Sequence, residues 1–212
     1  MNKLSFKRVL IYLIGMIVLA LGLTLNTKTS LGASAIVSVP FTVSEAYGLD
    51  FGNMTFAIYA LFIIVEIILD RKNFILILLQ LPLSIVFTRF MNIFKSIIPY
   101  SSSNLILNIA VSIIAIALTS AGAFLTIHMD LIPNPGDGFV SVISKKTGLE
   151  LGRCKNCVDI GCVLVSAAVG LINGNILMGI GIGTVLSMIL VGRFLSLINK
   201  AFRERLLRFV NK

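Results

Sequence analysis

Several residue types that enzymes and nucleic-acid-binding proteins rely on are scarce or missing. The chain has no tryptophan, one histidine and three cysteines, and charged residues make up only 13% of its 212 residues. A soluble domain carries about 25% charged residues. This chain therefore has too little polar surface to cover a domain that is surrounded by water.

Catalytic and metal-binding patterns are also missing from the sequence. His128 has no second histidine near it, and Cys154 and Cys157 form a lone C-x-x-C without a second pair. Such an isolated pair does not predict a zinc site. No Ser-His-Asp set and no pair of carboxylates is visible. We therefore expect neither an enzyme nor a bound cofactor or metal.

Long apolar runs dominate what is present. Hydrophobic residues make up 57% of the chain, and a helix needs about 20 mostly apolar residues to cross a bilayer. We predict an all-α polytopic membrane protein with six transmembrane helices. The runs that predict them are residues 9–25, 51–69, 74–94, 105–127, 157–172 and 176–198. The first run exceeds the apolar stretch of a signal peptide and no small-x-small cleavage site follows it, so we expect it to remain as a span.

The distribution of positive charge predicts the orientation of these helices. The net charge is +9, but no aromatic residues alternate with the basic ones, so nucleic acid is not an expected partner. With a cytoplasmic N-terminus, 14 of the 18 lysines and arginines fall on the cytoplasmic side and only Lys28 and Lys95 fall outside. This asymmetry predicts that both termini are cytoplasmic. The cytoplasmic set is Lys3, Lys7, Arg8, Arg71, Lys72, Lys145, Lys146, Arg153, Lys155, Lys200, Arg203, Arg205, Arg208 and Lys212.

The sequence repeats itself at a distance of 100 residues. The stretch GLDFG at 48–52 is matched by GLELG at 148–152, and further along, where the offset has slipped to 104, an Arg-Phe pair at 89–90 returns at 193–194. We predict an internal duplication, with a first repeat of residues 1–100 and a second of residues 101–212 that carries the basic tail. Three spans per repeat is an odd number, so the second repeat is turned over. Inverted repeats of this kind are common in transporters.

Each predicted repeat contains a segment that fits neither a loop nor a span. Residues 29–47 and 129–147 are too apolar for a solvated loop and too interrupted by Gly and Pro for a crossing helix. We predict that each is a re-entrant or broken half-helix, whose N-terminal N–H groups would suit an anion. The alternative is an amphipathic helix that lies on the membrane surface. Water accessibility of the serines in these segments distinguishes the two.

Charged residues inside the apolar runs point to a site. A charge at the bilayer centre costs about 2.5 to 3.5 kcal/mol on insertion scales. Arg89 and Arg193 occupy corresponding positions, and they either face an anionic substrate or extend to the headgroups. Lys155 and Asp159 are four residues apart, so they share a helix face and are expected to pair. Glu66 lies near the charged end of its run, where we expect it to be solvated.

Uncharged polar residues within the runs are expected to face the protein interior. Gln80, Asn108 and Thr184 are of this kind, and Gln80 corresponds to Thr184 at an offset of 104. The predicted substrate-binding residues are Ser34, Ser38, Gln80, Arg89, Asn134, Asp137, Ser141, Asp159, Thr184 and Arg193.

Four stretches of the sequence resemble a known family. PGDGF at 135–139, Lys155 followed by Asp159, GIGIGTVLSMILVGRF at 179–194 and LLQLPLSIVF at 78–87 are similar to those of the YczE/YitT-type bacterial membrane proteins. The resemblance covers almost the whole chain and implies an integral protein of the bacterial cytoplasmic (inner) membrane. It implies no particular activity.

Three functions are compatible with these patterns. The first is a membrane transporter for a small molecule, with an anion favoured by the arginines, whose site lies between the two inverted repeats. The second is a substrate-binding membrane subunit resembling the S-components of energy-coupling-factor importers, which co-purification with coupling subunits would reveal. The third is a non-transporting accessory protein. The expected partners are the lipid bilayer, a small-molecule substrate, and either a second copy of the chain or coupling subunits.

Overall fold

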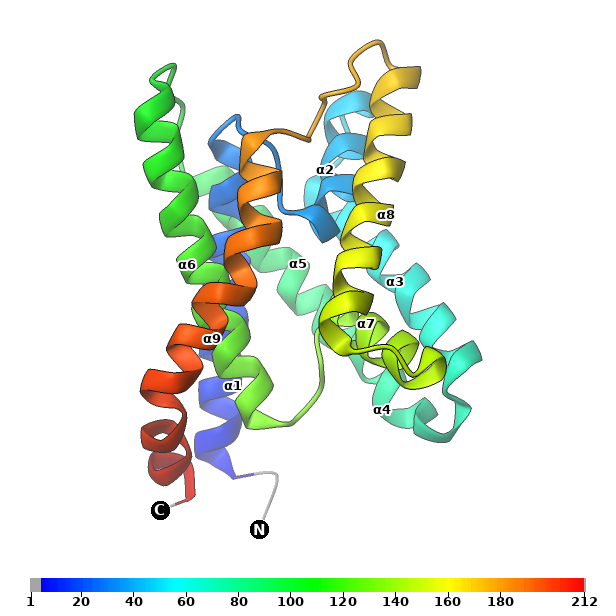
Figure 1. The fold of residues 1–212 in the computed structure, drawn as a ribbon, viewed down its shortest axis with the longest axis vertical. Coiled ribbons are helices and arrows are strands. Elements are labelled where there is room, and N and C mark those ends of the chain that lie inside the picture. The colour runs from blue at the N-terminus through cyan, green and yellow to red at the C-terminus, as the bar shows by residue number, and fades with distance from the viewer. Residues whose placement is uncertain (1–4, 212) are drawn as a thin grey trace.

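The computed structural model describes residues 5–211, and every regular element in that range is a helix. Both ends of the described chain lie at the same end of the molecule (Figure 1). Lys3 and Lys212, two of the predicted cytoplasmic basic residues, fall outside the described residues. The elements are α1 (Phe6–Lys28), α2 (Ala35–Tyr47), α3 (Phe51–Leu69), η1 (Arg71–Asn73), α4 (Phe74–Leu78), α5 (Gln80–Ile97), α6 (Leu105–Met129), α7 (Pro135–Thr147), α8 (Leu151–Ile172) and α9 (Ile182–Asn211).

The prediction of six apolar helices long enough to cross a membrane is confirmed within the described residues. The six are Phe6–Lys28, Phe51–Leu69, Arg71–Ile97, Leu105–Met129, Leu151–Ile172 and Ile182–Val210. The third is interrupted at Leu79, between α4 and α5. Pro82 accounts for the break, because a proline ring clashes with the carbonyl four residues earlier, which belongs to Leu78. The last helix begins at Ile182 rather than at residue 176, since glycines occupy the preceding connection.

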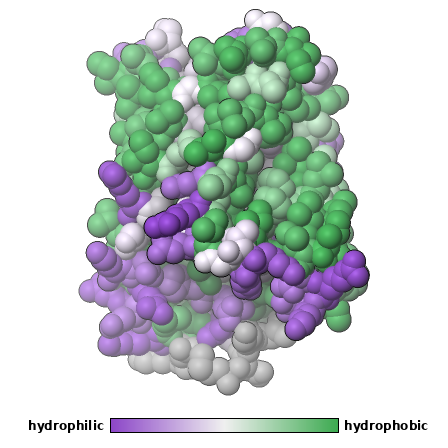
Figure 2. Space-filling view, turned by 45° about the vertical axis from the view of Figure 1, so that its right-hand side comes forward, coloured by the Kyte–Doolittle hydropathy of each residue, from purple (hydrophilic) through white to green (hydrophobic). Residues whose placement is uncertain are grey.

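The surface of these helices is that of a protein in lipid. On α3 the residues Leu61, Ile64 and Ile68 are exposed, whereas Tyr59 and Glu66 are buried. The apolar face thus points outward and the polar face inward. Figure 2 shows a second separation, along the length of the molecule: hydrophilic residues gather toward the end where the termini lie, and hydrophobic residues cover much of the rest of this face.

Two short helices occupy the segments that were predicted to be broken. α2 and α7 have 13 residues each, or about 20 Å at 1.5 Å per residue, which is too short for a hydrocarbon core of about 30 Å. Each ends in a left-handed glycine, Gly48 with φ 63° and Gly148 with φ 72°. In Figure 1 the chain turns back from the end of α1 toward the middle of the molecule before α2 begins, and it does the same between α6 and α7.

The two halves of the chain are interleaved. α1 packs along α6, and the short helices exchange partners, because α2 packs on α8 of the second half and α7 packs on α3 of the first. α5 lies against α1, and α9 lies correspondingly against α6. Each half therefore completes the packing of the other, and the chain folds as one unit rather than as two separable domains.

Close contact between α1 and α6 depends on glycines. A Cβ added at Gly22 would lie 2.5 Å from the Thr119 backbone nitrogen, and one added at Gly122 would lie 2.4 Å from the Leu19 nitrogen. Small residues allow helix backbones to approach in a membrane, where apolar burial gives little driving force between helices. Asn26 joins this pair to α9: it accepts from Ser112 at 2.8 Å and donates to Ser187 at 3.2 Å.

The two repeated glycine–acid turns differ in their acids. The Asp50 Oδ1 atom caps α3 by accepting from the Asn53 N–H at 2.7 Å and from Asn92 at 2.6 Å, whereas Glu150 makes no side-chain cap on α8 and contacts Arg153 at 3.4 Å. We expect Asp50→Ala to lower the free energy of unfolding by about 1 kcal/mol. Glu150→Ala should change it by less than about 0.5 kcal/mol. Thermal melting of both variants in detergent tests this, and equal losses would contradict the assignment.

Candidate functional site

A small pocket lies where α7 begins. Asn134 is the N-cap of α7, its side chain accepts from the Gly136 N–H at 3.1 Å, and Pro135 starts the helix, which is the favoured place for proline. The pocket separates this helix end from α1, α5 and α6, and its volume is about 10 Å³, enough for roughly one water molecule. Its lining is Tyr12, Met16, Leu19, Leu83, Ser84, Phe87, Thr126, Pro133, Asn134 and Pro135.

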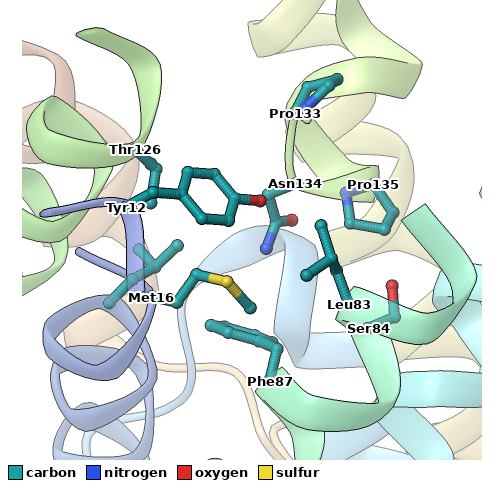
Figure 3. Close-up of a pocket in the computed structure, with 10 residues that line it drawn as sticks. Tyr12, Met16, Leu83, Ser84, Phe87, Thr126, Pro133, Asn134 and Pro135 are labelled. Carbon is teal, nitrogen blue, oxygen red and sulfur yellow. The ribbon is translucent and has the colours of Figure 1, made fainter. Parts of the chain in front are cut away.

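A hydrogen bond at one wall of this pocket joins two distant parts of the chain. The Tyr12 hydroxyl donates to the Ile132 carbonyl at 2.7 Å, which ties α1 to the connection that precedes α7. Figure 3 shows the Tyr12 hydroxyl beside the Asn134 side chain, with Met16 and Phe87 closing the opposite side. Asn134 also lies within interacting distance of the buried Tyr59 hydroxyl on α3. The pocket therefore has an apolar wall and a small set of polar groups, as small-molecule sites do.

A charged cluster extends from the same helix end. Lys155 contacts the buried Asp159 carboxylate at 3.4 Å, so the predicted pairing on α8 is confirmed. Asp137 on α7 also feels the positive charge of Lys155. Burial raises the pKa of the Asp137 carboxyl above its usual value, and Lys155 opposes this rise. Lys155 is thus the positive charge near two carboxylates, and a single lysine cannot neutralise the charge of both.

A buried polar pair joins α3 to α5. Gln80 donates from Nε2 to Glu66 Oε2 at 2.9 Å, and each of the two residues is only 1% exposed. Gly138 of α7 covers the pair, because a Cβ there would lie 2.8 Å from Glu66 Oε2 and 2.9 Å from Gln80 Nε2. Glu66 Oε1 and Gln80 Oε1 are both buried without a hydrogen-bond partner.

A buried contact between α2 and α8 involves positions that are 100 residues away from Glu66 and Gly138, and it carries no charge. Ser166 of α8 donates to Ser38 of α2 at 2.8 Å, and these residues stand 100 positions from Glu66 and Gly138. Thr184, the counterpart of Gln80, accepts from the Gly181 N–H at 3.2 Å. Positions 100 residues apart in the sequence therefore carry different side chains, and of these two buried contacts only Glu66–Gln80 contains an ionisable group.

The glycines of GIGIGT have a structural role. They lie in the connection before α9 and in its first turn, where Gly183 N donates to the Leu31 carbonyl at 2.7 Å and Ala33 N donates to the Gly179 carbonyl at 2.9 Å. A Cβ at Gly181 would lie 2.4 Å from the Leu31 oxygen. These glycines allow the α8–α9 connection to approach the α1–α2 connection closely.

The predicted site residues separate into three groups. Gln80, Asp159, Thr184 and Ser38 are buried, and the expectation that Gln80, Asn108 and Thr184 face the interior is confirmed. Ser34, Asn134, Asp137 and Ser141 are half-buried on the two short helices, with Ser34 at the N-cap of α2. Arg89 and Arg193 are exposed, and the structure brings neither of them to the others.

The outward position of both arginines follows from helix geometry. Arg89 lies nine residues after Gln80 (89 − 80), and Arg193 lies nine residues after Thr184 (193 − 184). Nine residues make two and a half turns at 3.6 residues per turn, so a residue nine positions from a buried one points away from it. Extension to the lipid headgroups is thus the alternative that this geometry favours.

Glu66 is the site residue that sequence reasoning placed wrongly. It was expected to be solvated at the end of its run, but it is buried against Gln80 and Gly138. A signal was present, because Thr55, Tyr59 and Glu66 recur at helical spacing on one face of α3, and all three are buried. Since the other residues of α3 are mostly apolar, that polar stripe predicts the side of the helix that points inward.

These features define a helical membrane protein with a polar interior and two short helices. Among residues 5–211, no group of three or more His, Cys, Asp or Glu is placed to hold a metal ion. The chain belongs to a family of unknown function, DUF6198, whose model matches residues 6–200. Neither the curated proteins nor the solved structures contain a significant match to it. The family match does not name the YczE/YitT group, so that resemblance stays a prediction.

Proposed function

We propose that the chain is a membrane transporter for a small polar molecule, with its site at the N-terminus of α7. One observation carries the proposal: the short α7 begins in the interior, at a pocket lined by Tyr12, Ser84, Thr126 and Asn134. Half-helices with exposed N-termini near the bilayer midplane are the usual binding elements of transporters built from inverted repeats. The volume of the pocket then corresponds to a closed state that must open to admit a substrate.

The proposal includes the inverted arrangement of the two repeats. Its support is the correspondence of α2 and α7, which have equal length, N-caps at Ser34 and Asn134, and left-handed glycines at Gly48 and Gly148. The exchange of partners, α2 with α8 and α7 with α3, is what two antiparallel halves around a shared centre would produce. The cytoplasmic position of both termini and the YczE/YitT resemblance belong to the same proposal.

The preferred substrate follows from the charges near the pocket. The exposed arginines do not contribute, so the positive end of α7 is the main attraction for an anionic group. Asp137 in the first turn of α7 opposes such a group, and Lys155 balances it. A substrate that carries both an anionic and a hydrogen-bonding group fits this combination better than a simple anion.

Native mass spectrometry of the protein released from lipid nanodiscs tests the site. We expect a recurrent small-molecule adduct that is lost in Asn134→Asp, which keeps the helix cap but puts a negative charge in the pocket. Arg89→Gln and Arg193→Gln are the matched controls and should keep the adduct. Loss of the adduct in the arginine variants alone would move the site to the outer surface. Recovery only with a larger protein partner, and without an adduct, would favour a coupling-subunit or accessory role.

A further inference from the structure

Two buried oxygens beside α7 have no partner, although each belongs to a group that is already hydrogen-bonded. Gln80 Nε2 donates to one oxygen of the Glu66 carboxyl, and the second oxygen of each group, Glu66 Oε1 and Gln80 Oε1, is left over. An ionised carboxylate and an amide oxygen are both acceptors, so they cannot satisfy each other. A buried polar group without a partner is costly, and rare enough to require an explanation.

A single proton on Glu66 would give both of these oxygens a hydrogen-bond partner. Protonation turns Glu66 Oε1 into an O–H donor, and Gln80 Oε1 is an unpartnered acceptor on the residue that Glu66 already contacts. The carboxylic acid and the amide would then make two mutual hydrogen bonds, and neither group would carry a charge inside the helix bundle. A metal ion fits less well, because a hard cation takes six or more oxygen ligands and this pair supplies three.

We propose that Glu66 and Gln80 form a proton-binding site, in which Glu66 holds a proton at Oε1 and this O–H group donates a hydrogen bond to Gln80 Oε1. The proton fastens α3 to α5 directly beneath Gly138 of α7. Its release would leave a charged carboxylate against the backbone of α7 at Gly138. The site would act in this way whether or not the pocket at Asn134 binds a molecule.

The charged groups around the pair do not offer Glu66 a counter-ion. Among residues 5–211, no lysine or arginine of its own helix or of the elements packed against it forms a salt bridge with Glu66, and Asp70, four residues further along the chain, is itself negative. The other charged residues of these elements are Glu45 on α2, Arg71 and Lys72 on η1, Arg89 and Lys95 on α5, and Asp137, Lys145 and Lys146 on α7. A proton is therefore the remaining way to neutralise this carboxyl.

Infrared spectroscopy of the full chain in nanodiscs at neutral pH tests the proposal. The wild-type protein should show the carbonyl stretch of a protonated carboxylic acid, and Glu66→Gln should lack it. Gln80→Leu should keep this band but shift it to higher frequency, because the acid loses its hydrogen-bonded partner. A difference spectrum in which Glu66→Gln removes only ionised carboxylate bands would overturn the proposal, as would a band that appears or vanishes with added sodium.

The pH dependence of stability gives a second test. It compares the wild type with Glu66→Gln, which has the same shape as the original residue and is therefore expected to fold. Since the folded state holds a proton that the unfolded chain releases at neutral pH, the melting temperature of the wild type should fall as the pH rises. Glu66→Gln can make the same two hydrogen bonds without titrating, so its melting temperature should fall less steeply than that of the wild type as the pH rises through neutrality. Ser166→Ala, which changes the uncharged contact between α8 and α2, should keep the wild-type dependence of melting temperature on pH. Equal slopes in Glu66→Gln and the wild type would refute the site.

Discussion

Gly122→Ala is expected to lower the free energy of unfolding by about 3 kcal/mol, because the added methyl group meets backbone rather than a side chain that could move. Its Cβ would lie 2.4 Å from the Leu19 nitrogen and 2.8 Å from the Gly15 oxygen on α1. Overpacking costs about 1 to 3 kcal/mol, and the upper end applies here since both helix backbones must separate. Thermal melting of the purified protein in detergent measures the loss.

The control for this variant lies in another long helix. Gly161 stands inside α8, and a Cβ there would have no atom within 4 Å, so Gly161→Ala should keep or slightly raise the melting temperature, as alanine favours the helix. The pair separates steric contact from the general effect of removing a glycine. If both variants melt alike, the close contact between α1 and α6 is not what holds this part of the fold.

The long helices could be predicted from the sequence because the bilayer imposes a simple constraint. A segment that crosses it must be apolar over about 20 residues, and hydropathy alone locates such segments. The short helices were also predictable, since PNPGDG at 133–138 combines a helix start with residues that interrupt a span. Helix ends were less accurate. The last helix begins later than its apolar run, because the glycines there serve the contact between Leu31 and Gly183.

The candidate site was harder to predict because hydropathy does not tell which face of a helix points inward. Gln80 and Arg89 lie on the same helix and both are expensive in lipid, yet one is buried and the other exposed. The spacing of nine residues between them was enough to show that they could not share a face. The position of Gly138 over Glu66 could not be predicted, since this contact arises from the packing of α7 on α3, which joins opposite halves of the chain.

Lys155→Met is expected to have the second largest effect on stability. Asp159 is 3% exposed, and Lys155 is its hydrogen-bonded partner at 3.4 Å, so the variant leaves a buried carboxylate without a cation and takes the same cation from Asp137. Removing one member of a buried pair costs about 3 to 5 kcal/mol. The Lys155 side chain is 37% exposed and water screens part of the interaction, so we expect a loss of about 2 kcal/mol.

Two further variants isolate the cause of this loss. Adding Asp159→Asn to Lys155→Met should restore most of the melting temperature, because the amide carries no charge. Arg208→Met is the matched control for an exposed pair of the same spacing, since Arg208 and Glu204 are 3.3 Å apart and 79% and 85% exposed, and it should cost less than about 1 kcal/mol. A double variant less stable than Lys155→Met would contradict the explanation.

The pH dependence of Lys155→Met in a chain that already carries Asp159→Asn gives an independent check on Asp137. Burial already raises the pKa of its carboxyl, and Lys155 restrains that rise. Without the lysine the folded-state pKa increases further above the unfolded value, so folding then favours the protonated acid. Stability is therefore greatest at low pH and decreases as the pH rises through the folded-state pKa. A melting temperature that rises on acidification in the Lys155→Met/Asp159→Asn double variant, more steeply than in Asp159→Asn alone, would place Lys155 as the cation shared between α7 and α8, next to the pocket at Asn134.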